Sequence, residues 1–125
     1  MAKTILVVDD SASFRRIEIM ALTGAGYEVI DACDGVDALN KLDQLSEQKI
    51  HLIICDVNMP NMGGIEFVTR AKQNPKFKFT PVMMLTTEDS DVIKQQGRTA
   101  GAKAWMVKPF KSEQLLNAVS KLILP

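Results

Sequence analysis

Cysteine, histidine and tryptophan are scarce in this chain of 125 residues, which has two cysteines, one histidine and one tryptophan. Cys33 and Cys55 lack the close pairing of zinc ligands, and two cysteines do not make a disulfide scaffold. Both lie in strand-like segments, so we expect reduced thiols in the core of a cytoplasmic protein. This scarcity argues against a zinc module and against a small disulfide-stapled secreted domain.

Long apolar runs and an excess of charge of either sign are also missing. The run at residues 5–8 is cut short by Asp9 and Asp10, so we expect neither a signal peptide nor a membrane-spanning helix. The 15 acidic residues balance 15 basic ones, which gives no reason to expect a nucleic acid or a membrane surface as partner. With 46% hydrophobic residues, the chain predicts one domain over residues 1–125 with its own core. We also expect this domain to be a monomer.

Apolar runs alternate with helical patterns along the whole chain. Strands are predicted at five such runs, residues 4–8, 28–32, 52–55, 82–85 and 104–107. Helices are predicted at about 13–23, after Asp34-Gly35, after Gly64, and behind the caps Ser90 and Ser112. Residues 73–80 are expected to form a polar, basic loop. Five strand–helix units of this kind predict a parallel sheet with helices on both faces.

The second strand and the first helix allow more detailed predictions. Residues 28–32 alternate polar and apolar, which is typical of an edge strand. An edge at this position favours a flavodoxin-like, doubly wound α/β fold with strand order 2-1-3-4-5 and five helices. In the first helix, which Ser11 or Ser13 is expected to cap, Phe14, Ile17 and Ala21 share the face predicted to be buried.

Polar side chains follow four of the predicted strands at the points where the strands end. Asp9 and Asp10 follow the first strand, Asp56 the third, Thr86 and Thr87 the fourth, and Lys108 the fifth. Parallel strands deliver these groups to one edge of the sheet, where open α/β sheets bind ligands. Taken singly, each has an ordinary explanation as a turn residue, a helix cap or a surface charge. Their coincidence at four separate strand ends favours a site.

Three carboxylates that meet at one edge repel each other. Two unit charges ~4 Å apart cost about 4 kcal/mol at an effective dielectric constant of 20. A divalent cation removes this cost, and oxygen ligands with room for several waters indicate Mg²⁺. Lys108 could then pair with a phosphoryl oxygen and a Thr86 hydroxyl could donate to another, which leaves the Asp56 carboxylate to attack a phosphoryl donor. The pattern therefore predicts a phosphoryl-accepting aspartate beside a magnesium site.

Several motifs together resemble the receiver domains of bacterial two-component response regulators, and in particular the single-domain chemotaxis regulators. The matching segments are residues 7–11, 34–35 with 38–39, 56–64, 85–87, 101–102 and 107–110, and they span the whole chain in order. The resemblance implies that a histidine kinase phosphorylates Asp56. It also implies that Asp9, Asp10, Asp56 and the backbone carbonyl of Asn58 hold Mg²⁺, and that the bond before Pro109 is cis.

The resemblance further implies how a signal leaves the site. Lys108 is expected to contact the phosphoryl group, and Thr86 to transmit its presence to a readout surface made of the fourth helix, fifth strand and fifth helix. Asn58 and Glu88 are expected to tune hydrolysis. Trp105 stands where the family usually has Tyr or Phe, so it is either an aromatic switch or a fixed residue of the partner-binding surface. Because no effector domain follows Pro125, we expect the output to be protein binding or onward phosphotransfer.

Three partners and three rival functions follow from this interpretation. The partners are a histidine kinase, a target such as the flagellar motor switch, and possibly a phosphatase. A phosphorelay intermediate is the alternative within the family. An aspartyl-phosphate hydrolase is the alternative enzyme, but it needs a second Asp as general acid where this chain has Asn58. A flavin-binding role fails because Asp9 and Asp10 would repel the phosphate. We therefore expect no metabolic enzyme, although the domain is expected to assist its own phosphorylation and dephosphorylation.

Overall fold

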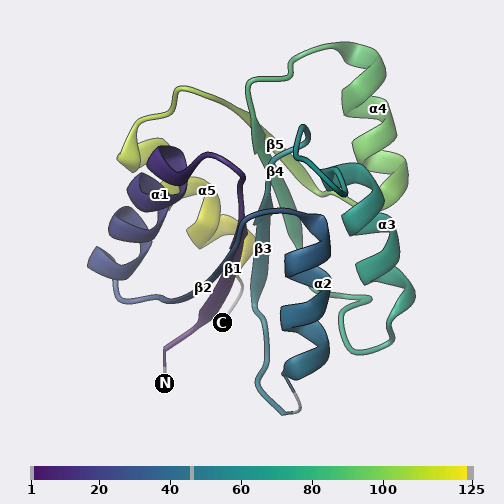
Figure 1. The fold of residues 1–125 in the computed structure, drawn as a ribbon. Helices are drawn as coiled ribbons and strands as arrows, with labels where there is room; N and C mark the ends of the chain where they lie inside the picture. Colours follow the sequence, from purple (N-terminus) through teal and green to yellow (C-terminus); the bar gives the residue numbers. More distant parts are fainter. Residues whose placement is uncertain (1, 46, 124–125) are drawn as a thin grey trace.

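The computed structural model describes residues 2–45 and 47–123, and the remaining residues of the predicted domain (1, 46, 124 and 125) lie outside the described part. Five strands and five helices alternate in the order β1 (Thr4–Val8), α1 (Ala12–Gly24), β2 (Glu28–Ala32), α2 (Gly35–Gln44), β3 (Leu52–Cys55), α3 (Gly64–Gln73), β4 (Val82–Thr86), α4 (Asp91–Ala100), β5 (Ala104–Val107) and α5 (Ser112–Leu122). The strands form one parallel sheet in the order β2-β1-β3-β4-β5 (Figure 1). The predicted flavodoxin-like fold is thus confirmed.

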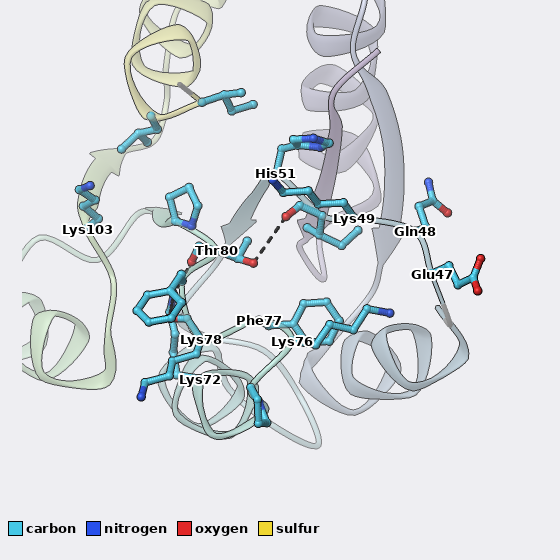
Figure 2. A pocket seen from close by; sticks show the side chains of 16 residues that line it. Glu47, Gln48, Lys49, His51, Lys72, Lys76, Phe77, Lys78, Thr80 and Lys103 are labelled. Atoms are coloured by element: carbon cyan, nitrogen blue, oxygen red, sulfur yellow. Dashed lines mark hydrogen bonds between the residues drawn. The ribbon is translucent and has the colours of Figure 1, made fainter. Parts of the chain in front are cut away.

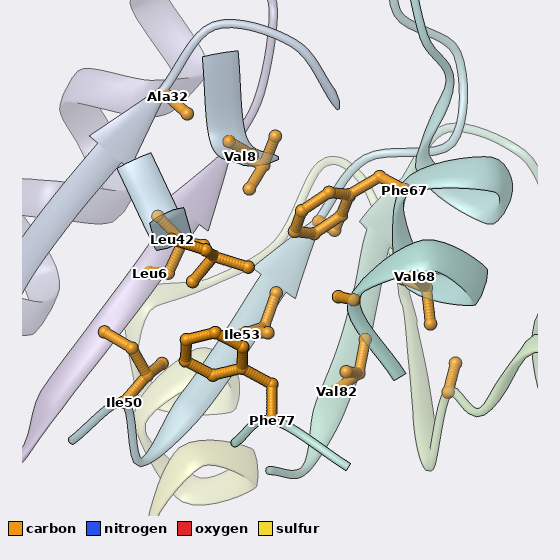
Figure 3. Close-up of a cluster of buried hydrophobic side chains, with 14 of the residues drawn as sticks. Leu6, Val8, Ala32, Leu42, Ile50, Ile53, Phe67, Val68, Phe77 and Val82 are labelled. Carbon is orange, nitrogen blue, oxygen red and sulfur yellow. The ribbon is translucent and has the colours of Figure 1, made fainter. Parts of the chain in front are cut away.

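The two faces of the sheet bury two separate hydrophobic clusters. Side chains alternate along each central strand, so Ile5 and Val7 pack with Leu22 of α1 and Leu115 of α5. Leu6 and its counterparts on the other strands face α2, α3 and α4 instead, where Phe67 and Phe77 fill the space over the sheet (Figure 3). Because both faces of β1, β3 and β4 are buried, these strands are apolar throughout.

The prediction of which face of α1 is buried is wrong by about one residue. Ile17, which we expected in the core, is 49% exposed, and the buried residues of this helix are Glu18 and Leu22. Phe14 and Ala21 are half-buried. The hydrophobic pattern misled because a charged residue is rarely buried, so Glu18 was assigned to solvent and the apolar Ile17 to the core.

The predicted helix caps and core thiols are confirmed in part. Ser11 and Ser90 cap α1 and α4, each accepting from a backbone N–H three residues ahead. Ser112 is not a cap, because α5 begins with it and Lys111 takes the cap position, donating its N–H to Gln114 Oε1 at 3.2 Å. Cys55 is buried as expected, but Cys33 is exposed because it lies just past β2, on the loop at the edge of the sheet. No helix of the described residues has the length and hydrophobicity to cross a bilayer.

Candidate functional site

Three carboxylates lie together at the carboxyl edge of the sheet. Val8 pairs with Cys55 across β1 and β3, so the residues that follow, Asp9 and Asp56, leave their strands side by side. The Asp56 N–H donates to the Val8 carbonyl at 2.9 Å, which extends the pairing by one residue. With the neighbouring Asp10, each side chain places a carboxylate oxygen within 4.8 Å of the other two. Asp9 and Asp56 are buried, whereas Asp10 is exposed and keeps the cluster open to water.

The loop after β3 holds Asp56 in place. Its carboxylate oxygen Oδ1 accepts the N–H of Val57 at 2.6 Å, which fixes the orientation of the side chain. The chain then turns back, and the Gly64 N–H donates to the Val57 carbonyl at 2.8 Å. A Cβ atom at Gly64 would lie 1.9 Å from the Asp56 carbonyl oxygen, so only glycine permits this turn. Glycine at the start of α3 is therefore required by the packing beneath Asp56.

Lys108 reaches into the cluster from the end of β5. Its Nζ donates to Asp9 Oδ2 at 2.7 Å and to Asp56 Oδ2 at 2.8 Å, and it lies 4.3 Å from the centroid of the Phe14 ring. Burial disfavours the charged ammonium, but the hydrogen bonds to Asp56 and Asp9 outweigh burial and raise the pKa of Lys108 above its usual value. The peptide bond between Lys108 and Pro109 is cis, as the family resemblance implied. Lys108 is thus a fixed cation between two carboxylates.

The donors of this cluster suit a hard divalent cation. Three carboxylates face a single ammonium, so the cluster keeps a negative charge beyond what Lys108 neutralises. All donors are oxygens, and the exposed side of Asp10 leaves room for water ligands, a combination that Mg²⁺ prefers. The predicted ligand set therefore fits the residues present, and the role of the Asn58 carbonyl stays a prediction.

Glu88 joins three of the other predicted site residues through hydrogen bonds. Its N–H donates to Thr86 Oγ1 at 3.2 Å, its side chain accepts from Asn58 Nδ2 at 3.1 Å, and its carbonyl accepts from Trp105 Nε1 at 2.9 Å. The β4–α4 loop is thus tied at one residue to the hydroxyl of Thr86, to the loop after Asp56 and to the indole. The hydrogen bond from Trp105 to Glu88 was not predicted, because no sequence pattern indicates which backbone carbonyl an indole N–H will reach.

Trp105 is half-buried against α4 rather than free on the surface. A Cβ atom at Gly97 would lie 2.6 Å from Cζ3 of the indole, so the absence of a side chain at this position of α4 makes room for the ring. The ring packs on the core and donates to the Glu88 carbonyl, so a shift of the β4–α4 loop would change the surroundings of the indole.

Sequence reasoning missed one buried acid next to the cluster. Glu18 of α1 is 1% exposed, and within the described residues its Oε2 has no hydrogen-bond partner. Burial, followed by the hydrogen bond to Asp9 and the charge of Asp9, raises the pKa of Glu18 to about 9. We therefore expect Glu18 to be protonated at neutral pH, since a neutral acid lies beside the Asp9 carboxylate without repulsion. The sequence offers one indication that Glu18 is buried, which is its spacing of four residues from both Phe14 and Leu22 along the helix.

We expect Glu18→Gln to stabilise the metal-free protein at alkaline pH. Because the pKa of Glu18 is raised on folding, the folded state binds one more proton than the unfolded state between about pH 5 and 9, and stability falls as the pH rises through this window. Gln needs no proton to stay neutral, so the free energy of unfolding of the variant should fall less as the pH rises. At pH 9 we expect the variant to be more stable than wild type by about 1–3 kcal/mol. Urea unfolding with a chelator at pH 5, 7 and 9 measures this. The matched control is Glu66→Gln, at an exposed residue of α3; equal pH slopes in Glu18→Gln and wild type would contradict the prediction.

Known proteins that are similar in sequence to this chain belong to one family. Residues 5–120 match the family model of the response regulator receiver domain. The chain is 39% identical to the chemotaxis protein CheY1 of Helicobacter pylori over 121 residues, covering 96% of this chain and 95% of that one. It is 37% identical to the protein PilG of Pseudomonas aeruginosa over 115 residues, 92% of this chain and 83% of PilG.

A solved structure extends the agreement to three dimensions. The chemotaxis protein CheY4 of Vibrio cholerae, crystallised at low pH, superposes with a TM-score of 0.92 at 44% identity, covering 99% of this chain and 100% of that one. The family model, the relatives and this structure cover nearly the same residues as the sheet and the acidic cluster described above. The chain belongs to the response regulator receiver domain family, and it is similar to that family's chemotaxis regulators.

Proposed function

We propose that this protein is a phosphorylation-activated response regulator of a chemotaxis-type two-component system. It takes a phosphoryl group from a histidine kinase onto Asp56 and then binds a target protein, for which a flagellar motor switch is the leading candidate. The observation that carries the proposal is the hydrogen bonding of one buried ammonium, Lys108, to both Asp9 and Asp56 beside the exposed Asp10. A nucleophile, a fixed cation and a metal-suited acid cluster are what phosphoryl transfer to a carboxylate requires.

The transfer step uses the residues in defined roles. An oxygen of the Asp56 carboxylate attacks the phosphorus of the kinase phosphohistidine, a P–O bond forms, and the P–N bond breaks with its electron pair going to the imidazole, which then takes a proton from water. Lys108 keeps its proton because its pKa is raised, and it pairs with a phosphoryl oxygen. Asp9, Asp10 and Asp56, with the Asn58 carbonyl, would hold Mg²⁺, which when bound would neutralise charge on the phosphoryl group.

The signal leaves through Thr86. Its buried hydroxyl now accepts from the Glu88 N–H, and we propose that a phosphoryl oxygen on Asp56 draws this hydroxyl away. Release of the Glu88 N–H moves the β4–α4 loop, whose Glu88 carbonyl holds the indole of Trp105. The surface of α4, β5 and α5 changes as a result. Moving a population from 1:99 to 99:1 needs about 5.5 kcal/mol of preference for the active state.

Capture of the target tests the function as a whole. The chain is immobilised with Mg²⁺, with or without beryllofluoride as a phosphoryl mimic, and cell proteins retained by each form are compared. We expect a motor-switch or other signalling protein only in the loaded arm, and none in that arm with Asp56→Asn. Equal retention by both forms would contradict phosphorylation-dependent binding.

Two rival functions give other results in a transfer experiment. A phosphorelay intermediate would hand labelled phosphoryl from Asp56 to a histidine phosphotransfer protein. An aspartyl-phosphate hydrolase would turn over a phosphomonoester many times. The residue two beyond Asp56 is Asn58, which lacks the acid group that such a hydrolase needs, so we expect slow hydrolysis of the chain's own phosphoryl group only. The protein is proposed to act in the cytoplasm as a monomer.

We expect Glu88→Lys to lengthen the life of the phosphoryl group. Glu88 is half-buried and bonded to Asn58, so the two side chains border the path of an attacking water. A bulky ammonium there should hinder the water and slow decay by about fivefold, a change of about 1 kcal/mol in the barrier. Loss of the adduct is followed by mass spectrometry after removal of the donor. Asp91→Lys, an exposed position in the first turn of α4, is the control, and equal decay in Glu88→Lys and wild type would remove Glu88 from this role.

A further inference from the structure

A second hollow lies at the opposite end of the sheet from Asp56. It is an open groove of about 700 Å³ at the amino ends of β3, β4 and β5, between the α3–β4 loop and the end of α5 (Figure 2). Because the strands are parallel and four or five residues long, the groove and the acidic cluster lie roughly 15 Å apart along the sheet. The proposed phosphoryl chemistry makes no use of it.

Lysines dominate the lining of this groove. Five of its residues are lysines, against one glutamate, although the whole chain carries no net charge. Lys49, Lys78 and Lys103 are exposed, and none of these three forms an ion pair within the described part of the chain. Burial, with the charge of Lys103, lowers the pKa of Lys72, and burial, with Lys3 and Lys49, lowers that of His51. Within the described residues, the charges of Lys49, Lys78 and Lys103 are therefore not paired with an acid.

The α3–β4 loop, which carries Lys76 and Lys78, is held by several hydrogen bonds. Lys72 Nζ donates to the carbonyls of Lys78 and Thr80, and the Thr80 N–H donates to the Phe77 carbonyl at 3.1 Å. Phe77 is buried in the core, whereas Phe79 is 88% exposed with the Lys78 Nζ 5.6 Å from its ring centroid. The backbone of this loop is therefore held by hydrogen bonds, and it exposes an aromatic ring and a cation to solvent.

We propose that this groove docks an acidic segment of a partner protein, whose carboxylates pair with Lys49, Lys78 and Lys103 while an apolar side chain packs on Phe79. Charge complementarity carries the choice of occupant. The chain carries no net charge, so it lacks the overall attraction with which proteins bind a nucleic-acid backbone, whereas a short acidic segment needs only the local positive charge of the groove. This favours protein carboxylates over nucleic acid. The site is independent of the proposed function, because a partner bound here leaves Asp56 uncovered. Such a partner would tether the chain whether or not Asp56 is phosphorylated.

Titration of the whole chain with a labelled peptide tests the proposal. The probe is a ten-residue peptide of glutamates around a central leucine, followed by fluorescence anisotropy, with a glutamine-for-glutamate peptide as comparison. We expect binding of the acidic peptide only, weakened about tenfold in the triple variant Lys49→Gln, Lys78→Gln, Lys103→Gln and also weakened in Phe79→Ala. The control is Arg16→Gln, Arg98→Gln, Lys111→Gln, which removes equal charge from exposed sites elsewhere.

Further arms separate the other occupants. Beryllofluoride with Mg²⁺ should leave the affinity unchanged, so a failure of the phosphorylation proposal would not affect this result. Equal weakening in the control variant, equal binding of the neutral peptide, or binding that appears only with beryllofluoride would each overturn the proposal. Tighter binding of single-stranded RNA or of phosphatidylserine vesicles than of the acidic peptide, abolished by the same triple variant, would overturn it in favour of that ligand.

Discussion

Asp56→Asn should abolish phosphorylation of this protein. Oδ1 of the Asp56 carboxylate accepts from the Val57 N–H and Oδ2 accepts from Lys108, so the proposed nucleophile is buried and held in place. An amide is far less nucleophilic than a carboxylate, yet it has the same size and keeps the turn at Gly64. We expect at least a hundredfold loss of adduct, equivalent to about 2.7 kcal/mol in the barrier.

Intact-mass measurement follows this loss directly. The chain is incubated with Mg²⁺ and acetyl phosphate, and the mass increase of one phosphoryl group is recorded over time. Asp43→Asn, an exposed position in α2, is the matched control and should behave as wild type. Formation of an acid-stable, base-labile adduct at the wild-type rate in Asp56→Asn would show that another residue accepts the phosphoryl group.

Asp10→Ala should weaken Mg²⁺ binding by at least about tenfold. Asp10 is the informative member of the cluster because it is exposed and makes no contact with Lys108, whereas Asp9 and Asp56 are each bonded to this lysine. Removal of Asp10 therefore takes away one metal-suited carboxylate without freeing a buried charge. Folding stability should change by less than about 0.5 kcal/mol, as for most exposed positions.

Calorimetric titration with MgCl₂ measures this affinity without reference to phosphorylation. Asp43→Ala removes an exposed carboxylate far from the cluster and should bind the ion as wild type does. An Asp10→Ala variant with unchanged affinity would count against a site made of Asp9, Asp10 and Asp56 together. Lys108 would then be the one cation that neutralises charge in the described cluster.

The sequence predicted the sheet and the meeting of the site residues for one physical reason. Buried parallel strands are apolar along their whole length, so their ends are conspicuous, and all of their carboxyl ends lie at one edge. Asp9, Asp56 and Lys108 each follow such an end, which is why their convergence could be expected before any coordinates. The metal and phosphoryl roles of these residues rest on the proposed function.

Other features depend on tertiary contacts that no local pattern encodes. Glu18 lies in the core beside the acidic cluster with a raised pKa, and a hydrophobic pattern cannot foresee a buried acid. The indole of Trp105 finds the Glu88 carbonyl across 17 residues of chain. The lysines of the groove come from three separate segments, of which only the basic loop at 73–80 was visible in the sequence.

Activation itself can be followed with Trp105, the only tryptophan in the chain. The measurement is acrylamide quenching of its emission, with Mg²⁺, with and without beryllofluoride, in wild type, Thr86→Ala and Thr86→Ser. If Thr86 leaves Glu88 for the occupied Asp56, the vacated space admits the indole, and burial of an aromatic ring favours this state. We predict reduced quenching in wild type and in Thr86→Ser, which keeps the hydroxyl, and no change in Thr86→Ala. Unchanged quenching in wild type with Asp56 occupied would contradict the switch and leave Trp105 as a fixed residue of the binding surface.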